Sequence, residues 1–444
     1  MDTLELQDRP APTARREPRS RGLVLGMLCF VYVLNFLDRQ LVSILAKPIQ
    51  DSLQISDSQL GRITGFYFAL FYCFIAIPVG WLADRTNRVK VLSIACGLWS
   101  AATAACGMAA NYGQLVVARM AVGVGEAGGV PPSYAIISDI YPREQRGTAM
   151  GIFNLGPPLG SALGVAFGAS LAAAYDWRIP FYVVGGIGVL TAIIVYLVIP
   201  EPERGRFDPV PAPTATDVPA QSFGSAIRAF FGNRILAVAA LASGAANFIT
   251  YGLSNFATLF LMREKGMTLE DVAIWYALAV GLGMGTGIFV AGRLIDRFAV
   301  KNKAAYASIP ALSLLLALPF FLGFAAADRW ETALALLFVP LFLNSFFLPA
   351  TVTFVQGEVD PSARVISGAL LLLVMNLVGL GLGPTFVGMA SDYFRADHGE
   401  HALRMAYYAL APMYLVAALL FVWLARLIRK SETGQADTST LGRQ

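Results

Sequence analysis

Long apolar stretches separated by short polar segments run along almost the whole chain. A membrane-spanning helix needs about 20 mostly apolar residues, and the sequence offers two sets of six such stretches. The first set is predicted at 22–46, 59–83, 89–110, 114–140, 146–174 and 180–199. The second set is predicted at 234–262, 270–295, 304–326, 332–357, 364–390 and 402–428. This pattern predicts an all-α membrane protein with twelve transmembrane helices in two six-helix bundles.

A proline-rich polar segment lies between the two sets and has too few apolar residues to span a membrane. It is predicted to be a linker. Apolar residues then return at helical spacing at Phe223, Ile227, Phe230 and Phe231, which indicates a short helix lying on the membrane surface. The predicted organisation is an N-terminal tail (1–21), a first bundle (22–199), a linker with its surface helix (200–233), a second bundle (234–428) and a C-terminal tail (429–444).

Composition supports the membrane class. Hydrophobic residues make up 56% of the 444 residues and charged residues only 14%, whereas charged residues are about 25% of a typical soluble protein. A soluble globule, a disordered chain and a coiled coil are therefore excluded, and a net charge of +4 is too small to indicate a nucleic-acid partner. The four cysteines lie in apolar stretches without metal-ligand spacing. We expect no metal, no cofactor and no catalytic residues.

The distribution of positive charge predicts the orientation. With both termini placed in the cytoplasm, lysine and arginine are about three times as frequent in the cytoplasmic segments as in the outer loops. Positive charge stays on the cytoplasmic side of membrane proteins. We therefore expect a multi-pass protein of the bacterial inner membrane, functional as a monomer, with both termini cytoplasmic.

An internal repeat links the two halves. The second predicted span ends in G-x-x-x-D-R at Gly80, Asp84 and Arg85, and the eighth ends in the same pattern at Gly292, Asp296 and Arg297. A six-plus-six parallel duplication is one of the architectures of secondary transporters.

This pattern resembles the major facilitator superfamily over nearly the whole chain, which implies the major facilitator fold. Gly80, Asp84, Arg85 and Arg88 are similar to the superfamily's signature between helices 2 and 3, although Asn87 stands where a glycine is usual. The resemblance implies that these residues, with Asp296 and Arg297, form a cytoplasmic latch between the halves. Gly80 would allow close helix approach, and the Asp84 carboxylate would accept from N–H groups at a helix N-terminus.

Two further segments, N-F-L-D-R at 35–39 and R-M-A-V-G-V-G-E-A at 119–127, resemble the spinster-like branch of the superfamily. Animal members of that branch are associated with the movement of sphingosine-1-phosphate and lysolipids. The resemblance implies lipid transport and leaves the substrate of this chain open.

Three ionisable residues lie well inside predicted spans: Asp38, Arg119 and Glu126. Such residues are costly in a membrane and indicate function. Arg39 is next to Asp38 but points about 100° away on a helix, so Asp38 needs a partner on another helix. Helix depth favours Arg119. Glu126 lies two turns from Arg119, on the same face.

We expect proton coupling in which Arg119 exchanges between the two carboxylates, so that one of them binds or releases a proton. Two alternatives stay open. Asp38 and Arg119 could form a static ion pair between helices, or Arg119 could bind an anionic head group.

The second half offers amides and hydroxyls in place of buried charges. The predicted substrate site combines them with polar and aromatic residues of the first half, and its members are Arg39, Arg119, Tyr72, Asn247, Tyr251, Asn255, Asn344 and Asn376. Hydrogen bonding between packed helices is the alternative for any single member.

Taken together, these features predict a proton-coupled secondary active transporter that moves an amphipathic organic anion or lipid-like substrate by alternating access. The alternative is a uniporter or exporter of small organic acids without proton coupling, with Arg119 as the carboxylate site. No nucleophile or metal cluster suggests an enzyme.

Overall fold

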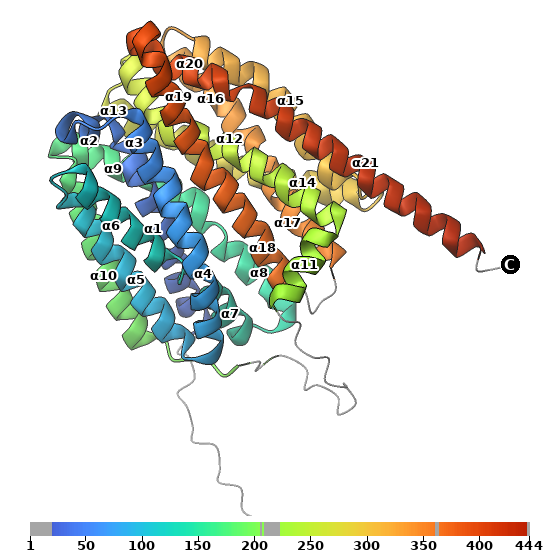
Figure 1. Ribbon diagram of the computed structural model, residues 1–444. Coiled ribbons are helices and arrows are strands. Elements are labelled where there is room, and N and C mark those ends of the chain that lie inside the picture. Colours follow the sequence, from blue (N-terminus) through green and yellow to red (C-terminus); the bar gives the residue numbers. More distant parts are fainter. Residues whose placement is uncertain (1–19, 205–206, 208–222, 360–363, 442–444) are drawn as a thin grey trace, which may run out of the picture.

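The computed structural model of the chain describes residues 20–204, 207, 223–359 and 364–441. These residues form helices and contain no β-strand (Figure 1). The predicted all-α class is therefore confirmed. The N-terminal tail up to residue 19, most of the linker and residues 442–444 lie outside the described residues.

The first half contains the helices up to residue 198. They are α1 (Arg21–Ile44), α2 (Ala46–Leu53), α3 (Asp57–Gly61), η1 (Arg62–Phe66), α4 (Tyr67–Arg85), α5 (Arg88–Gly107), α6 (Tyr112–Glu126), α7 (Val130–Ile140), α8 (Arg143–Phe153), α9 (Gly156–Ala174) and α10 (Arg178–Val198). A helix, α11 (Phe223–Gly232), lies where the sequence predicted a short helix on the membrane surface.

The second half follows the same plan. Its elements are α12 (Arg234–Lys265), α13 (Leu269–Asp271), η2 (Val272–Tyr276), α14 (Ala277–Ala299), α15 (Ala305–Ala326), α16 (Trp330–Leu343), η3 (Asn344–Phe346), α17 (Phe347–Glu358), α18 (Arg364–Val374), η5 (Met375–Leu382), α19 (Gly383–His398), η6 (Gly399–His401), α20 (Ala402–Leu410) and α21 (Pro412–Leu441).

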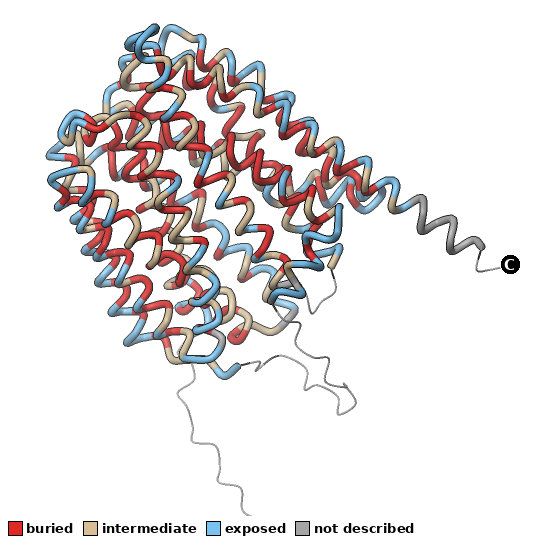
Figure 2. Tube along the Cα trace, viewed as in Figure 1, coloured by how far each residue is buried: buried red, intermediate tan, exposed pale blue. Residues whose placement is uncertain are grey.

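Within the described residues, 10 helical stretches are long and apolar enough to cross a membrane. Two features account for the difference from twelve. The stretch Ile366–Glu432 is 67 residues long and reverses near Gly399, whose φ of 54° lies in the left-handed region, so that α19 and α20 pack together. In addition, α6 and α7 are short helices separated at 127–129. Figure 2 shows buried residues concentrated where helices face one another.

The internal repeat is visible in the backbone. Ser56 and Thr268 occupy equivalent positions in the two halves, and each caps the helix that follows by accepting a backbone N–H. A π-helical segment comes next in both halves, at η1 and at η2. Isolated π-helical turns are frequent at functional sites. The two halves therefore share local structure beyond the G-x-x-x-D-R sequence.

Two ends of the bundle are distinguished below. The linker end is where α1 begins, α10 ends and α11 lies, and the far end is where α2, α3 and α13 lie (Figure 1). Contacts between the halves join α3 to α19, α2 to α12 and α13 to α9, and they also join α9 to α14, α4 to η5 and α1 to α12. The first three pairs involve elements of the far end, so the two halves are in contact there.

Candidate functional site

A first ion pair joins α1 to the end of α6. Arg39 Nε donates to Glu126 Oε2 over 2.5 Å, and the two side chains are 11% and 0% exposed. Adjacent residues on a helix point about 100° apart, so Arg39 reaches a different neighbour from the one that Asp38 contacts. Glu126 is the last residue of α6, just before the break at 127–129.

A second ion pair lies beside the first. Arg119 Nη1 lies 3.7 Å from Asp38 Oδ1, and both side chains are 2% exposed. The Thr103 hydroxyl of α5 donates to the other carboxylate oxygen of Asp38. Among the described residues, neither Asp38 Oδ1 nor Arg119 Nη1 has a hydrogen-bond partner. The contact predicted between Asp38 and Arg119 is present, and it is loose.

The partner of Glu126 differs from the prediction. The sequence suggested an Arg119 that exchanges between Asp38 and Glu126, two turns away on the same face, whereas in this structure Glu126 pairs with Arg39. The long Arg39 side chain crosses from α1 to the end of α6, which helix-face arithmetic does not capture. The site therefore holds two carboxylates and two guanidinium groups, each acid with its own arginine.

One aromatic ring contacts both arginines. The Phe68 ring centroid lies 5.1 Å from Arg39 Cζ and 5.2 Å from Arg119 Cζ. Tyr72 and Phe36 complete the surroundings of Arg39, at 4.9 Å and 5.0 Å from its Cζ. Cations are attracted to aromatic faces at these distances. The sequence marked Phe68 only as one of several aromatic residues available for apolar contact, and it does not predict that this ring lies between the two arginines.

The predicted amides lie in the second half, and two of them already form hydrogen bonds to neighbouring helices there. Asn247 Nδ2 donates to the Met375 carbonyl at the start of η5 over 2.8 Å, and Asn344 Nδ2 donates to the Tyr414 hydroxyl over 3.0 Å. Both bonds stay within the second half. They are the bonds between packed helices that the alternative interpretation anticipated.

Asn255 plays a different part, because it bridges the two halves. The Ser43 hydroxyl of α1 donates to Asn255 Oδ1 over 2.6 Å. Tyr251, half-buried one turn earlier on α12, lies within electrostatic range of Arg39. Asn376 is half-buried in η5. These positions bring Tyr251 toward the charged residues of the first half.

The predicted latch is only partly described, since the Asp84 side chain lies outside the described part of the chain. Arg88 pairs with Asp139 of α7, within its own half, and Arg85 Cζ lies 4.1 Å from the Trp81 ring centroid. Asp296 and Arg297 are exposed.

The role predicted for Gly80 is corrected by the structure. A side chain at Gly80 would meet no atom within 4 Å. The close helix approach that the sequence suggested at this glycine is therefore absent in this conformation.

The structure instead contains a clamp at the far end that the sequence analysis missed. The Asp57 carboxylate, 0% exposed, accepts two bonds of 2.8 Å from Arg263 and one of 2.9 Å from Arg395. Ser391 and Gln50 donate to it over 2.6 Å each. We call these five residues, with Asp392, the far-end clamp.

Asp392 completes the clamp from the second half. Its carboxylate oxygens accept from the backbone N–H groups of Asp57 and Ser58, over 3.2 Å and 2.9 Å. An anion is favoured at a helix N-terminus. The only local signal for this arrangement was the capping box of Ser56 and Gln59.

In the described part of the chain, no group of three His, Cys, Asp or Glu side chains could hold a metal ion. A helical membrane bundle built from two related halves, with paired charges buried in one of them, defines the class of secondary transporters.

The match of residues 28–367 to the Major Facilitator Superfamily identifies the family, and the chain belongs to it. The family and the fold are those of membrane transporters and not of enzymes.

Individual relatives agree with this assignment. The chain is 33% identical to an MFS-type efflux pump of Mycolicibacterium smegmatis, covering 93% of this chain and 94% of that protein. It is 27% identical to human protein spinster homolog 1, covering 86% and 75%. Its homologues are thus spinster-like proteins, as the sequence motifs indicated.

The structure is similar to the crystal structure of a bacterial homologue of the human lysosomal transporter Spinster in an inward-facing, unoccupied conformation. The TM-score is 0.86 at 29% identity, covering 94% of this chain and 99% of the other. The occupied, inward-facing form of a bacterial Spinster homologue gives a TM-score of 0.81 at 28% identity. The chain is therefore a multi-pass membrane transporter with bacterial homologues.

Proposed function

We propose that the chain is a proton-coupled transporter that moves an amphipathic organic anion or lipid-like substrate by alternating access. The observation that carries the proposal is the pair of ion pairs, Asp38 with Arg119 and Arg39 with Glu126, buried together in the first half. In this arrangement two positive and two negative charges balance. Any added proton leaves a guanidinium without a counter-ion.

That imbalance supplies the coupling. A buried charge that loses its partner costs about 3–5 kcal/mol, so protonation of either carboxylate creates a strong demand for an anion. The anionic group of a substrate meets that demand beside Arg39, the more accessible of the two arginines at 11% side-chain exposure. One proton and one negative charge would then occupy the site together. If either the proton or the substrate anion leaves, the charges in the site no longer balance, which favours departure of the other.

Arg119 is the natural sensor of the proton on Asp38. Their 3.7 Å separation and the unused hydrogen-bonding capacity of both atoms make this the weaker of the two pairs. Protonation of Asp38 would release Arg119 toward Glu126, two turns along the same helix. The exchange between carboxylates that the sequence suggested then becomes one step of the cycle, with Arg39 as the partner of Glu126 in the present state.

Aromatic side chains support an amphipathic substrate. Tyr32 stacks on Phe153 with ring centroids 4.4 Å apart, and Tyr134 packs edge-on against Phe153 at 5.3 Å. The Tyr134 hydroxyl donates to Asn154 Oδ1 over 2.8 Å. These rings would contact the apolar part of a substrate whose charged part binds near Arg39.

Orientation and state follow from charge and contacts. Both termini are proposed to be cytoplasmic, at the inner membrane of a bacterium, because lysine and arginine concentrate on that side. The far-end clamp then closes the outer side, and the present conformation faces inward. Its likeness to inward-facing Spinster homologues supports this assignment.

The alternative is an uncoupled carrier of small organic acids with Arg119 as the carboxylate site. The burial of Arg119, 2% exposed and facing Asp38, weighs against that role. Arg39 is the better candidate for direct contact with a carboxylate.

The test is flux in proteoliposomes under an imposed pH gradient, using an amphipathic anion as the probe. Glu126→Gln mimics the protonated acid. It should abolish the acceleration of anion flux by the pH gradient and should leave anion exchange without a gradient unchanged. Glu331→Gln is the matched control, because Glu331 is a solvent-exposed acid paired with Arg329, and it should behave as wild type. Gradient-driven flux at the wild-type rate in Glu126→Gln would refute the role of Glu126.

A further inference from the structure

The Thr103 hydroxyl lies beside the Asp38 carboxylate and has two acceptors within reach. It contacts Asp38 Oδ2 on the neighbouring helix, and it also lies 2.9 Å from the backbone carbonyl of Trp99, one turn earlier on α5. A hydroxyl carries one hydrogen and two acceptor lone pairs, so it can donate a full hydrogen bond to only one of these oxygens at a time. The Thr103 side chain is 0% exposed, which shields it from water.

The two oxygens of the Asp38 carboxylate have different surroundings. Oδ1 lies 3.7 Å from Arg119 Nη1 and has no hydrogen-bond partner among the described residues, whereas Oδ2 accepts from Thr103. The other charged or titratable groups near Asp38 are Arg39, Glu126 and Cys106. A proton that binds to Asp38 therefore belongs on Oδ2, because an O–H on Oδ1 would be repelled by the guanidinium group.

We propose that Thr103 is a positioning residue for proton binding at Asp38 and that its hydroxyl reverses the hydrogen bond when the proton binds. While Asp38 is ionised, Thr103 donates to Oδ2. Once Oδ2 carries the proton, the new O–H donates to Thr103 Oγ1, and the hydroxyl hydrogen of Thr103 turns to the Trp99 carbonyl. Asp38 thus keeps a hydrogen bond in both protonation states. The importance of this exchange for transport rests on the proton coupling proposed above.

Removing the hydroxyl should change the pH at which Asp38 binds its proton. A buried polar group without a hydrogen bond is costly, and the loose contact with Arg119 does not replace the bond from Thr103. Both protonation states lose a bond, but the ionised state loses more, because a hydrogen bond to a charged group is roughly twice as strong as a neutral one. The proton affinity of Asp38 should therefore rise about tenfold, which is about one pH unit.

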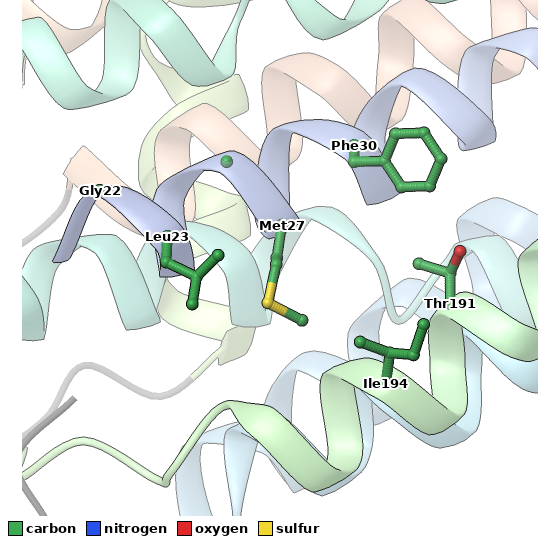
Figure 3. Close-up of a pocket in the computed structure, with 7 residues that line it drawn as sticks. Gly22, Leu23, Met27, Phe30, Thr191 and Ile194 are labelled. Carbon is green, nitrogen blue, oxygen red and sulfur yellow. The ribbon is translucent and has the colours of Figure 1, made fainter. Parts of the chain in front are cut away.

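Thr191 of α10 is a matched control, because it has the local geometry of Thr103 without the carboxylate. Its hydroxyl donates over 2.8 Å to the carbonyl of Ile187, four residues earlier, as Thr103 does to Trp99. Thr191 is 7% exposed and lines an apolar groove between α1 and α10, beside Ile194 (Figure 3). The described residues that line this groove include no acid. Thr191→Val therefore removes a helix hydroxyl far from any proton site.

The first measurement is infrared difference spectroscopy of the full-length protein in lipid vesicles, titrated with pH without substrate. The band of protonated Asp38 is assigned by its loss in Asp38→Asn, or by its displacement in Asp38→Glu if the first variant does not fold. In Thr103→Val its midpoint should rise by about one pH unit, and its frequency should change because the protonated acid loses its partner. Thr103→Ser restores the hydroxyl and should match wild type, as should Thr191→Val.

The second measurement is the pH profile of anion flux in proteoliposomes, which should move with the infrared midpoint in each variant. Thr103→Ala should repeat both shifts, which keeps the test valid if Thr103→Val does not fold. An unchanged infrared midpoint and frequency in the variants without the hydroxyl would overturn the proposal. So would an equal shift in Thr191→Val, a shift that Thr103→Ser does not restore, or a flux profile that does not follow the infrared midpoint. Wild-type flux without any response to a pH gradient would instead refute proton coupling, and the infrared titration would still decide the role of Thr103.

Discussion

Asp57→Asn should open the far end of the transporter. The Asp57 carboxylate is where Arg263, Arg395 and Ser391 of the second half converge on the first half. Because the outward-open state of an alternating-access transporter separates the halves at this end, these bonds exist only while the far end is closed. Weakening them therefore shifts the equilibrium between the two states.

The size of the shift follows from the geometry. Hydrogen bonds to charged groups contribute about 1.5–3 kcal/mol each, and Asp57 accepts three from arginines. Asparagine keeps one acceptor oxygen, and Arg395 is 46% exposed and can be hydrated instead. Most of the lost hydrogen-bond free energy therefore comes from Arg263, which is 19% exposed and less able to bind water instead. A cost of about 3 kcal/mol, the lower figure for breaking a buried pair, is expected, which is roughly a 100-fold change at about 1.4 kcal/mol per tenfold.

Distances between spin labels measure this shift directly. Labels at Asp51→Cys and Glu400→Cys, both exposed and on opposite halves at the far end, should be close in the parent protein and gain a longer component in Asp57→Asn. The four native cysteines are replaced first. Asp328→Asn is the control, since Asp328 is 94% exposed and 3.9 Å from Arg404 within the second half. An unchanged distance distribution in Asp57→Asn would refute the clamp.

Two further predictions concern other parts of the bundle. Phe68→Leu removes the ring that contacts both arginines, so thermal melts should show a loss of stability of about 1–2 kcal/mol and the pH dependence of flux should shift. Phe68→Tyr should preserve both the stability and the pH dependence. An unshifted pH profile in Phe68→Leu would show that Phe68 takes no part in the coupling. Asp84→Asn should weaken the latch inferred from the signature motif and raise cysteine accessibility at linker-end positions, and unchanged accessibility would count against that latch.

The fold was predictable because hydrophobic length and charge distribution act locally. A run of about 20 apolar residues predicts each span, and the repeated G-x-x-x-D-R indicates the duplication. Charged residues inside spans are also conspicuous, so Asp38, Arg39, Arg119 and Glu126 could be singled out. Their pairing could be predicted only in part. Helix geometry places Asp38 near Arg119, but it cannot foresee that the long Arg39 side chain reaches from α1 to the acid at the end of α6.

Features that depend on distant parts of the chain were out of reach. Asp57 lies at the end of a predicted span, where polar residues are common, so its charge does not indicate a site. Its arginine partners lie more than 200 residues away in the sequence. The bond from Asn247 to Met375 likewise depends on the π-helical segment η5. Amides that looked free in the sequence therefore turned out to be engaged within the second half.

The pair of Asp38 and Arg119 offers the sharpest distinction between coupling and a static structural role. Asp38→Asn leaves Arg119 without a charged partner, and Arg119→Ala leaves Asp38 with only the Thr103 hydroxyl. Each single change should cost about 3–5 kcal/mol and should impair transport. The double variant should recover much of the stability, because no lone charge is left in the membrane. It should not recover gradient-driven flux, because no group remains to exchange the proton, whereas a static pair predicts recovery of both. The same cycle on Arg329 and Glu331, 2.9 Å apart and 78% and 46% exposed, is the control and should give a coupling of about 0–1 kcal/mol. Additive losses at Asp38 and Arg119 would mean that the two residues do not act as partners.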